Sequence, residues 1–370
     1  MFHIPSNPIS IILSIPKTLQ EKKKNPTGFL WKKGGIGGVC ILLLCFCFCL
    51  GCNQPSDSQM LESNAVLMGT TASQKLYGTQ DERIADEIWQ LVGKLETELL
   101  SRREEGSEVA LVNQKLKTEK VVTISKALSE YLQLGQEIWR SGEGCFDLTL
   151  GELTSLWNID EQVGEEKPLI PTAEEIAKAK EKSGFANLTL VSSNSVQVET
   201  PVMLDLGAVG KGIALDEVAG YLEGEPAVTC AIISLGGSVL TYGEKQDHSP
   251  FQIAVVDPNH RDKVIGCLKL EGRHFVSTSG AYERFFEVDN TRYHHILDPV
   301  TGYPAKSDVL SATVVSDSGY LSDALSTACF ILGSEKGLTL AKMYQAQVLF
   351  VTTSGEILMS EELEGKFVKD

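Results

Sequence analysis

The apolar pattern of residues 66–368 changes from helical spacing in the first part to short strand-like runs in the second. Between residues 81 and 100, apolar side chains recur every three or four positions, which is typical of a helix with one buried face. Residues 125–140, with Ser125 as the cap, and a segment that opens at Pro171 predict two further helices. Helices followed by many short strands favour an α+β fold with largely antiparallel sheets and packed helices.

The later segments that we expect to be extended are short runs rich in apolar residues. They are residues 188–191, 195–199, 202–204, 229–234, 251–256, 264–270, 274–278, 285–288, 293–297, 311–315, 348–352 and 357–359. Two late helices are expected, at residues 213–222 and 322–332. No obvious linker divides the body, so the sequence predicts one large domain over residues 66–368.

Residues 1–51 have the layout of an export signal. Lysines at positions 22–24, 32 and 33 precede a short apolar run that ends in Leu50-Gly51-Cys52. A cationic stretch before an apolar run too short to span a bilayer comfortably is typical of a secretory signal peptide. The ending resembles a bacterial lipobox, although Cys49 stands where that motif usually has leucine. The resemblance implies cleavage before Cys52 and lipidation of that residue.

We therefore expect an exported protein that is anchored to the cell membrane as a lipoprotein, with residues 52–65 as a flexible tether. A lipobox cysteine carries a diacylglycerol on its sulfur and a further acyl chain on its amino group. Several acyl chains give stable anchoring where one chain does not. An uncleaved signal anchor with an incidental cysteine is the alternative.

The body after the signal segment is strongly acidic. Residues 52–370 carry 27 basic and 48 acidic residues, a net charge of −21. Such a body is a poor partner for nucleic acid, because the phosphate backbone repels it. A phosphorylated ligand bound here would need a cation to screen its charge. The four cysteines of the body lie in apolar surroundings and are expected to be unpaired core thiols, a disulfide being the alternative: Cys145, Cys230, Cys267 and Cys329.

A glycine-rich segment is the first of several that could carry chemistry. Residues 204–212 read Leu-Asp-Leu-Gly-Ala-Val-Gly-Lys-Gly, so a carboxylate at a strand end precedes a turn and a lysine where a helix begins. Glycines let the backbone approach a ligand, and the lysine and helix start favour phosphate. Taken alone, the segment is as often a plain tight turn. The Gly-Gly of residues 236–237 is likewise more often a turn.

Three later segments add polar side chains. Residues 277–284 read Ser-Thr-Ser-Gly-Ala-Tyr-Glu-Arg, and residues 294–304 read His-His-Ile-Leu-Asp-Pro-Val-Thr-Gly-Tyr-Pro. Adjacent histidines on a strand point to opposite faces, so at most one of them faces a site. Asp323 and Thr327, at i and i+4 on a helix, offer two oxygens to a hard cation. As an isolated pair they are more often a solvated face or a helix cap.

The order of these segments resembles the FAD:protein FMN transferases, the ApbE family. The resemblance starts at Met68-Gly69-Thr70 and continues through residues 107–113, 144–149 and 153–157. It therefore covers nearly the whole body and implies an ApbE-like flavin transferase domain over residues 66–368, with a T-fold-like arrangement. Its substrates would be FAD and an exported acceptor protein of a redox chain.

The resemblance also implies roles for individual residues. Met68 and the segment Cys145-Phe146-Asp147 would line the flavin and adenine parts of FAD, and Leu297 would pack on it. Asp205 and Lys211 would contact FAD, with Lys211 near the diphosphate. The magnesium ligands would be the side chains of Asp323 and Thr327 and the carbonyl of Ala208. The chain departs from the family at Arg102-Arg103, where an aromatic residue is common; Arg103 could stack or pair with phosphate instead. It also departs at Ala208 and Gly210, which replace the commoner glycine and alanine.

The implied activity is magnesium-dependent transfer of FMN from FAD to a serine or threonine hydroxyl, with release of AMP. His295 is the candidate to accept the hydroxyl proton, with Asp298 as a possible orienting partner. Two other interpretations remain open at this point. One is an FAD diphosphatase that uses water as the nucleophile, and the other is a non-catalytic flavin-binding lipoprotein.

Overall fold

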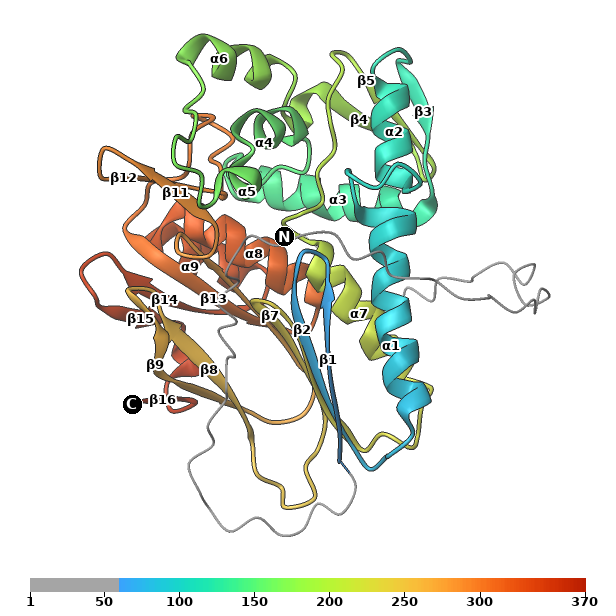
Figure 1. Ribbon diagram of the computed structural model, residues 1–370, viewed down its shortest axis with the longest axis vertical. Coiled ribbons are helices and arrows are strands. Elements are labelled where there is room, and N and C mark those ends of the chain that lie inside the picture. Colours follow the sequence, from blue (N-terminus) through green and yellow to red (C-terminus); the bar gives the residue numbers. More distant parts are fainter. Residues whose placement is uncertain (1–59) are drawn as a thin grey trace, which may run out of the picture. The chain divides into compact units, whose positions relative to one another are not determined.

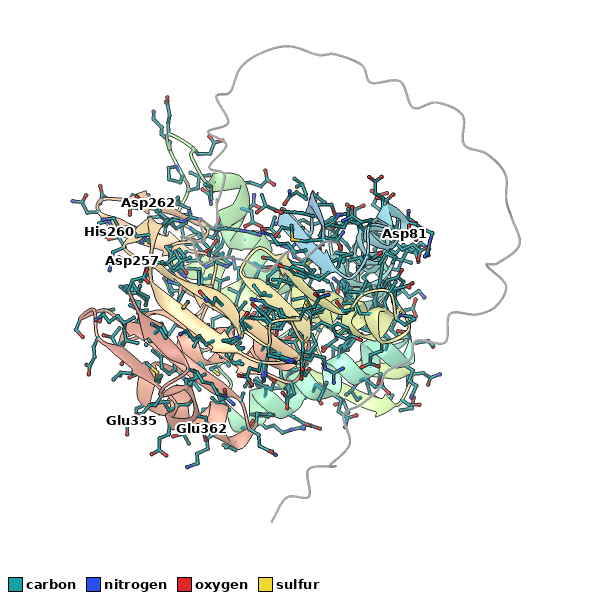
Figure 2. All side chains as sticks on the ribbon, turned by 90° about the horizontal axis from the view of Figure 1, so that it is seen from below. Asp81, Asp257, His260, Asp262, Glu335 and Glu362 are labelled. Carbon is teal, nitrogen blue, oxygen red and sulfur yellow. The ribbon has the colours of Figure 1, made fainter. Side chains whose placement is uncertain are left out.

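The computed structural model describes residues 60–370, which belong to one compact unit (Figure 1). The predicted signal peptide at 1–51 and the predicted lipidation site at Cys52 lie outside the described residues. Within residues 60–370, no helix is long and apolar enough to cross a membrane. Acidic side chains such as Asp81, Asp262, Glu335 and Glu362 are exposed at the periphery of the unit (Figure 2).

An eight-stranded sheet forms the centre of the unit, and every pair of neighbouring strands in it is antiparallel. In spatial order its strands are β1 (Met60–Leu67), β2 (Thr70–Tyr77), β6 (Cys230–Leu235), β7 (Ser238–Gly243), β10 (His274–Gly280), β13 (Val309–Ser316), β14 (Gln347–Thr352) and β15 (Ile357–Met359). Helices pack on this sheet, so the predicted α+β class with largely antiparallel sheets is confirmed.

The two faces of the central sheet are covered by different layers, as the alternation along β10 shows. Val276 belongs to an apolar core shared with Phe251 and Leu268. The next side chain, Ser277, lies on the opposite face, where its Oγ is 2.9 Å from the Oγ of Ser322. The first face packs on a small sheet of β8 (Phe251–Asp257), β9 (His260–Leu270) and β16 (Phe367–Lys369). The second carries α1 (Glu82–Lys94), α7 (Gly210–Glu223), α8 (Gly319–Leu332) and α9 (Ser334–Met343).

The remaining elements gather in the upper part of the view in Figure 1, above α7 and α8. They are the π-helical turn η2 (Leu95–Leu100), α2 (Glu108–Leu116), β3 (Val121–Thr123), α3 (Lys126–Ser141), α4 (Gly151–Trp157), α5 (Ile159–Gln162), α6 (Ala173–Glu181), η3 (Phe185–Asn187), β4 (Leu188–Ser192), β5 (Ser195–Val198), and the hairpin of β11 (Phe285–Val288) and β12 (Thr291–His294). The short turn η4 (Glu361–Leu363) precedes β16. Fully buried Trp157 centres a second apolar core that includes Leu297.

Several local predictions are confirmed and others need correction. Ser125 caps α3 through its side chain. The expected strand at 202–204 is reduced to a single bridge between Met203 and Leu150, because this segment meets the residue that precedes α4 and, in the described part of the chain, no neighbouring strand. The expected tether at 52–65 overlaps β1, which begins at Met60 and pairs with β2 along its length.

The cysteines agree in part with the expectation of core thiols. Cys145 and Cys329 are buried free thiols, and Cys267 is a free thiol that is only partly buried. Cys230 is buried as expected.

Helices α7 and α8 approach each other so closely that only glycine fits at the crossing. A Cβ on Gly212 would lie 2.1 Å from the carbonyl oxygen of Gly319, and a Cβ on Gly319 would lie 2.2 Å from that of Gly212. Neither backbone can move aside cheaply, because each belongs to a packed helix. The pair of glycines therefore fixes the distance between the two helices.

We expect Gly212→Ala to lower the free energy of unfolding by about 2–3 kcal/mol, because the new methyl group overpacks the crossing. Gly220→Ala on the same helix is the matched control. Nothing lies within 4 Å of the Cβ position at Gly220, so there alanine should raise stability by about 0.5–1 kcal/mol. Urea denaturation of both variants measures the contrast, and equal effects at the two positions would contradict the close-crossing argument.

Candidate active site

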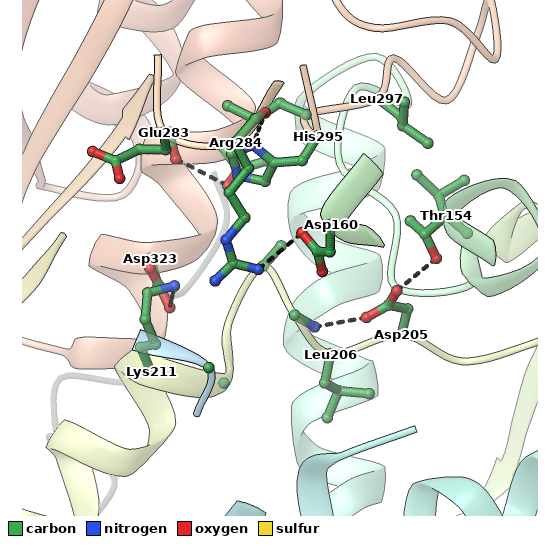
Figure 3. Close-up of a pocket in the computed structure, with 18 of the residues that line it drawn as sticks. Thr154, Asp160, Asp205, Leu206, Lys211, Glu283, Arg284, His295, Leu297 and Asp323 are labelled. Carbon is green, nitrogen blue, oxygen red and sulfur yellow. Dashed lines mark hydrogen bonds and ion pairs between the residues drawn. The ribbon is translucent and has the colours of Figure 1, made fainter. Parts of the chain in front are cut away.

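A cleft of about 460 Å³ lies where the helical elements meet the end of the central sheet. Its walls come from the β1–β2 turn, η2 and the loop that follows it, the segment 145–160, the turn before α7, the end of β10, residues 295–297 and one face of α8. Figure 3 shows the polar side chains that project into it. All the cofactor-binding and metal-ligating residues predicted from the sequence line this cleft: Met68, Arg103, Cys145, Phe146, Asp147, Asp205, Lys211, Leu297, Ala208, Asp323 and Thr327.

The β1–β2 turn places Met68 at the cleft. Met68 and Gly69 have φ values of 51° and 66°, and two successive left-handed residues are the signature of a tight hairpin turn. Positive φ is unfavourable for methionine, and the backbone N–H of Met68 is held by the Oε2 of Glu96 at 2.8 Å. Glu96 belongs to the π-helical turn η2. The side chain of Met68 reaches the start of α7, where its Cε lies 3.3 Å from the Cβ position of Gly210.

Asp205 organises the wall on the helical side. Its Oδ2 accepts hydrogen bonds from the Nε of Arg102 at 2.8 Å and the hydroxyl of Thr154 at 2.7 Å. Its Oδ1 accepts from the backbone N–H of Gly207 at 2.9 Å. The carboxylate therefore ties the glycine-rich turn to α4 and to the loop after η2, and its oxygens are largely engaged by the protein itself.

Asp147 has a similar structural task. Its Oδ1 accepts from the backbone N–H and the hydroxyl of Thr149, at 2.7 and 2.6 Å, and its Oδ2 accepts from the N–H of Phe185 at 2.8 Å. Burial raises the pKa of this carboxyl, and the three hydrogen bonds oppose that shift. The segment of Cys145 and Phe146 is thereby fixed against the helical core. The carboxylate of Asp147 is thus largely engaged by the protein itself.

Lys211 and Asp323 meet across the α7–α8 crossing. The Nζ of Lys211 lies 3.5 Å from the Oδ2 of Asp323. The same Oδ2 accepts from the backbone N–H of Gly212 at 2.9 Å, and Oδ1 accepts from the hydroxyl of Ser238 at 3.0 Å. Asp323 is only 5% exposed, so its position is set by two helices and the start of β7.

The oxygens beside Asp323 fit a hard cation. Thr327, one turn further along α8, lines the cleft, and its hydroxyl lies 3.2 Å from that of Ser279. Ala208, in the turn before α7, lines the same cleft. No group of three or more His, Cys, Asp or Glu side chains suited to a metal occurs within residues 60–370. A site with one carboxylate, a hydroxyl and a carbonyl suits magnesium, which keeps several water or phosphate ligands of its own.

His295 also lines the cleft and is held by one carbonyl. Its backbone N–H donates to the carbonyl oxygen of Arg284 at 3.1 Å, and its ring Nδ1 lies 3.3 Å from the same oxygen. Since a carbonyl can only accept, this contact, which is long for a hydrogen bond, favours the proton on Nδ1 and a lone pair on Nε2. Burial, reinforced by the positive charge of Arg284, lowers the pKa of His295 to about 4. The ring is therefore neutral at pH 7 and able to accept a proton.

Two residues near His295 in the sequence, Asp298 and His294, take no part in this arrangement. The carboxylate of Asp298 accepts from the backbone N–H of Val300 at 2.8 Å and so closes the turn before Gly302. Within residues 60–370, no hydrogen bond joins Asp298 to His295, and Asp298 does not line the cleft. The orienting partner of His295 is the Arg284 carbonyl instead. His294 is buried on the other face of the strand, where its Nε2 lies 3.0 Å from the carbonyl oxygen of Ala305.

Asp160 was not singled out from the sequence, and the structure places it at the rim of the cleft. Its Oδ1 accepts from Arg284 at 3.1 Å and its Oδ2 from Arg103 at 3.0 Å. Arg284 belongs to the polar segment 277–284 noted in the sequence, but no role was predicted for it. A lone aspartate on a helix as short as α5 carries no signal in sequence, because its partners lie more than fifty residues away on either side.

Known proteins of similar sequence and structure match nearly all of residues 60–370. The ApbE family model matches residues 68–350. An FAD:protein FMN transferase of Klebsiella pneumoniae (strain 342) is 34% identical over 316 residues, which cover 84% of this chain and 95% of that relative. Another, from Vibrio cholerae, is 29% identical over 315 residues, which cover 83% of this chain and 91% of the relative.

Solved structures agree. The crystal structure of the ApbE protein from Thermotoga maritima aligns with a TM-score of 0.75 at 31% identity, covering 84% of this chain and 100% of that one. The apo form of the Pseudomonas stutzeri flavinyl transferase ApbE aligns with a TM-score of 0.72 at 28% identity, covering 84% and 97%. A family match of this extent, together with agreement in both sequence and fold, shows that the chain belongs to the ApbE family.

Proposed function

We infer that this chain is an FAD:protein FMN transferase. The observation that carries the inference is the meeting, in one cleft, of Lys211, the Asp323 and Thr327 oxygens and a neutral histidine, His295. Curated relatives matched over most of the chain carry the same name. Phosphoryl transfer needs charge neutralisation and an aligned nucleophile more than it needs covalent help from the protein.

In the proposed reaction, the hydroxyl oxygen of a serine or threonine on the acceptor attacks the phosphorus on the FMN side of FAD. The new P–O bond joins FMN to the acceptor, the P–O bond to the AMP phosphate breaks, and AMP leaves. The proton of the attacking hydroxyl passes to the Nε2 of His295, whose Nδ1–H is directed at the Arg284 carbonyl. Lys211, in the first turn of α7, offers positive charge to the diphosphate.

We further propose that Asp323, Thr327 and the Ala208 carbonyl hold magnesium, which neutralises the charge of the diphosphate when bound. The support is the chemistry of the donor set, which consists of oxygen atoms only. Hydrogen bonds from Gly212 and Ser238 hold Asp323 in one orientation. Such outer contacts fix the direction in which a ligating carboxylate points.

The location of the protein is a proposal from the sequence. We propose that residues 1–51 direct export and that a lipid on Cys52 anchors the protein to the cell membrane, with an exported redox protein as the acceptor. Because β1 begins at Met60, the tether would span residues 52–59.

Mass spectrometry of a candidate acceptor, incubated with the protein, FAD and magnesium chloride, tests the activity. We expect the acceptor to gain the mass of FMN on a serine or threonine residue, with one AMP released for each adduct. FMN and AMP without an adduct would identify an FAD diphosphatase. Binding of FAD without turnover would identify a non-catalytic flavin-binding protein. Omission of magnesium is the control for the metal.

A further inference from the structure

Three charged side chains from separate segments meet at the rim of the cleft. Asp160 of α5 accepts one hydrogen bond from Arg103, in the loop after η2, and one from Arg284, in the turn between β10 and β11. Each guanidinium engages a different carboxylate oxygen, at 3.0 and 3.1 Å. We call these three residues the Asp160 clamp. Figure 3 shows Arg284 extending from beside His295 to Asp160.

The clamp is ionised at neutral pH. Burial by itself would raise the pKa of Asp160, but the charges and hydrogen bonds of Arg284 and Arg103 outweigh burial and hold the pKa below its usual value. Arginine does not lose its proton in proteins. Two charge-assisted hydrogen bonds therefore hold the carboxylate, and the clamp keeps this form throughout the working pH range.

Arg284 links the clamp to His295. Its side chain is bound to Asp160, while its carbonyl oxygen faces both the backbone N–H and the ring Nδ1 of His295. On one side of Arg284, Phe285 pairs with His294 in the β11–β12 ladder, whereas residues 281–283 on the other side have weak backbone support. The N–H of Ala281 donates to Leu310 at 3.3 Å, and that of Glu283 donates to Gly280 at 3.4 Å. These bonds are long, so the side-chain anchor at Asp160 adds restraint on the side of Arg284 that the ladder does not hold.

Stability alone gives no sufficient reason for the clamp. The side chains of Arg103, Asp160 and Arg284 are 51%, 26% and 42% exposed, and ion pairs this open to solvent add little to folding stability. Asp160 joins Arg103, in the loop after η2, to Arg284, whose carbonyl contacts His295. This arrangement indicates that the three residues fix the position of neighbouring groups.

We propose that Asp160 is a positioning residue: it anchors the side chain of Arg284 and so holds the carbonyl that orients the ring of His295. The proposal rests on the transferase function inferred above, in which His295 accepts the proton. Without the anchor, the Arg284 carbonyl moves, Nδ1 loses its fixed acceptor, and the Nε2 lone pair no longer faces the attacking hydroxyl for most of the time.

Steady-state kinetics of Asp160→Asn test the catalytic consequence. With FAD, magnesium chloride and the acceptor identified by mass spectrometry, we expect kcat to fall by about 10- to 100-fold, the scale of small misplacements in a catalytic group. KM for FAD should change less than kcat, because both carboxylate oxygens of Asp160 already accept hydrogen bonds from Arg103 and Arg284. Glu287→Gln is the matched control, because it breaks an exposed arginine–carboxylate pair of 3.2 Å, Arg292–Glu287, on the adjacent hairpin. The control should keep the wild-type kcat.

A second measurement does not depend on turnover. Nitrogen-15 NMR of the histidine rings reports which ring nitrogen carries the proton, and His295→Asn assigns the signal. In the wild type, His295 should carry its proton on Nδ1, whereas in Asp160→Asn it should exchange between the two tautomers. Thermal unfolding should change by no more than about 4 °C in Asp160→Asn.

The outcomes separate the two proposals. An unchanged tautomer in Asp160→Asn overturns the positioning role, whatever happens to kcat. A mixed tautomer with wild-type kcat overturns the catalytic consequence. If the wild-type protein forms no FMN adduct on any acceptor, the transferase function fails, and the tautomer measurement still decides whether Asp160 positions His295.

Discussion

Asp323→Asn is expected to reduce magnesium-dependent FMN transfer by about 10³-fold, because a neutral amide replaces the only carboxylate in the proposed metal site. The amide keeps the shape of the side chain and one oxygen to accept from Gly212 or Ser238, so the packing of α8 should survive. Flavinylation of the acceptor, followed against magnesium concentration, measures the effect. The requirement for magnesium should also shift to higher concentration.

Asp323→Ala is the harsher variant and leaves two buried donors, Gly212 N–H and Ser238 Oγ, without their acceptor. It should therefore lose stability as well, by about 1–3 kcal/mol. Asp317→Asn is the control. Asp317 lies just before α8, and its side chain is 95% exposed, so the same change there should leave transfer intact. Full activity in Asp323→Asn would remove the metal site from the proposal.

His295→Asn is the second change with a large expected effect, a fall in kcat of between about 10² and 10⁴, the usual contribution of a general base. Asparagine preserves a donor that can reach the Arg284 carbonyl but offers no basic nitrogen. Single-turnover transfer from FAD to the acceptor measures the loss. His248→Asn serves as the control, because the His248 side chain is 83% exposed and does not line the cleft.

The pH dependence gives a further check on His295. Burial lowers its pKa to about 4, so the ring is neutral and basic above that value and protonated below it. Transfer should therefore be insensitive to this group between pH 5 and pH 7 and should fall about tenfold per unit below pH 4. The acid limb should be absent in His295→Asn. A limb near pH 6.5 in the wild type would mean that His295, which is partly buried in this structure, is exposed to water during turnover.

The sequence predicted the long amphipathic helices and the apolar central strands, because their burial follows a simple period. It missed the β1–β2 hairpin for physical reasons. β1 is an edge strand with no fully buried position, and β2 places Gln74 in the core, where its amide donates to Ser63 and to the carbonyl of Ala85. A buried polar residue at an inward position breaks the alternation that marks a strand. The short helices α4 and α5 are likewise set by tertiary packing around Trp157 rather than by their own pattern.

The candidate site was predictable where ordered motifs carry it and was not where a contact joins distant segments. Met68, Lys211, Asp323 and His295 all reach the cleft as expected. Asp298 follows His295 closely in sequence, yet its carboxylate closes a turn. The residue that orients His295 is Arg284, through its backbone carbonyl. Sequence patterns describe side chains, so a role played by a main-chain oxygen leaves no trace in them.

The contact between Gly212 and Gly319 has a consequence for redesign. Neither glycine leaves room for a Cβ on the other, so a larger residue at one position requires a change in the backbone at the other. Helix α7 therefore cannot be replaced by a helix from another protein unless α8 is replaced with it. Lys211 adjoins the contact on α7, and Asp323 lies one turn after it on α8. The distance between Lys211 and Asp323 is therefore set by the two helix backbones. A redesigned protein that keeps this helix crossing will also keep the lysine–carboxylate distance.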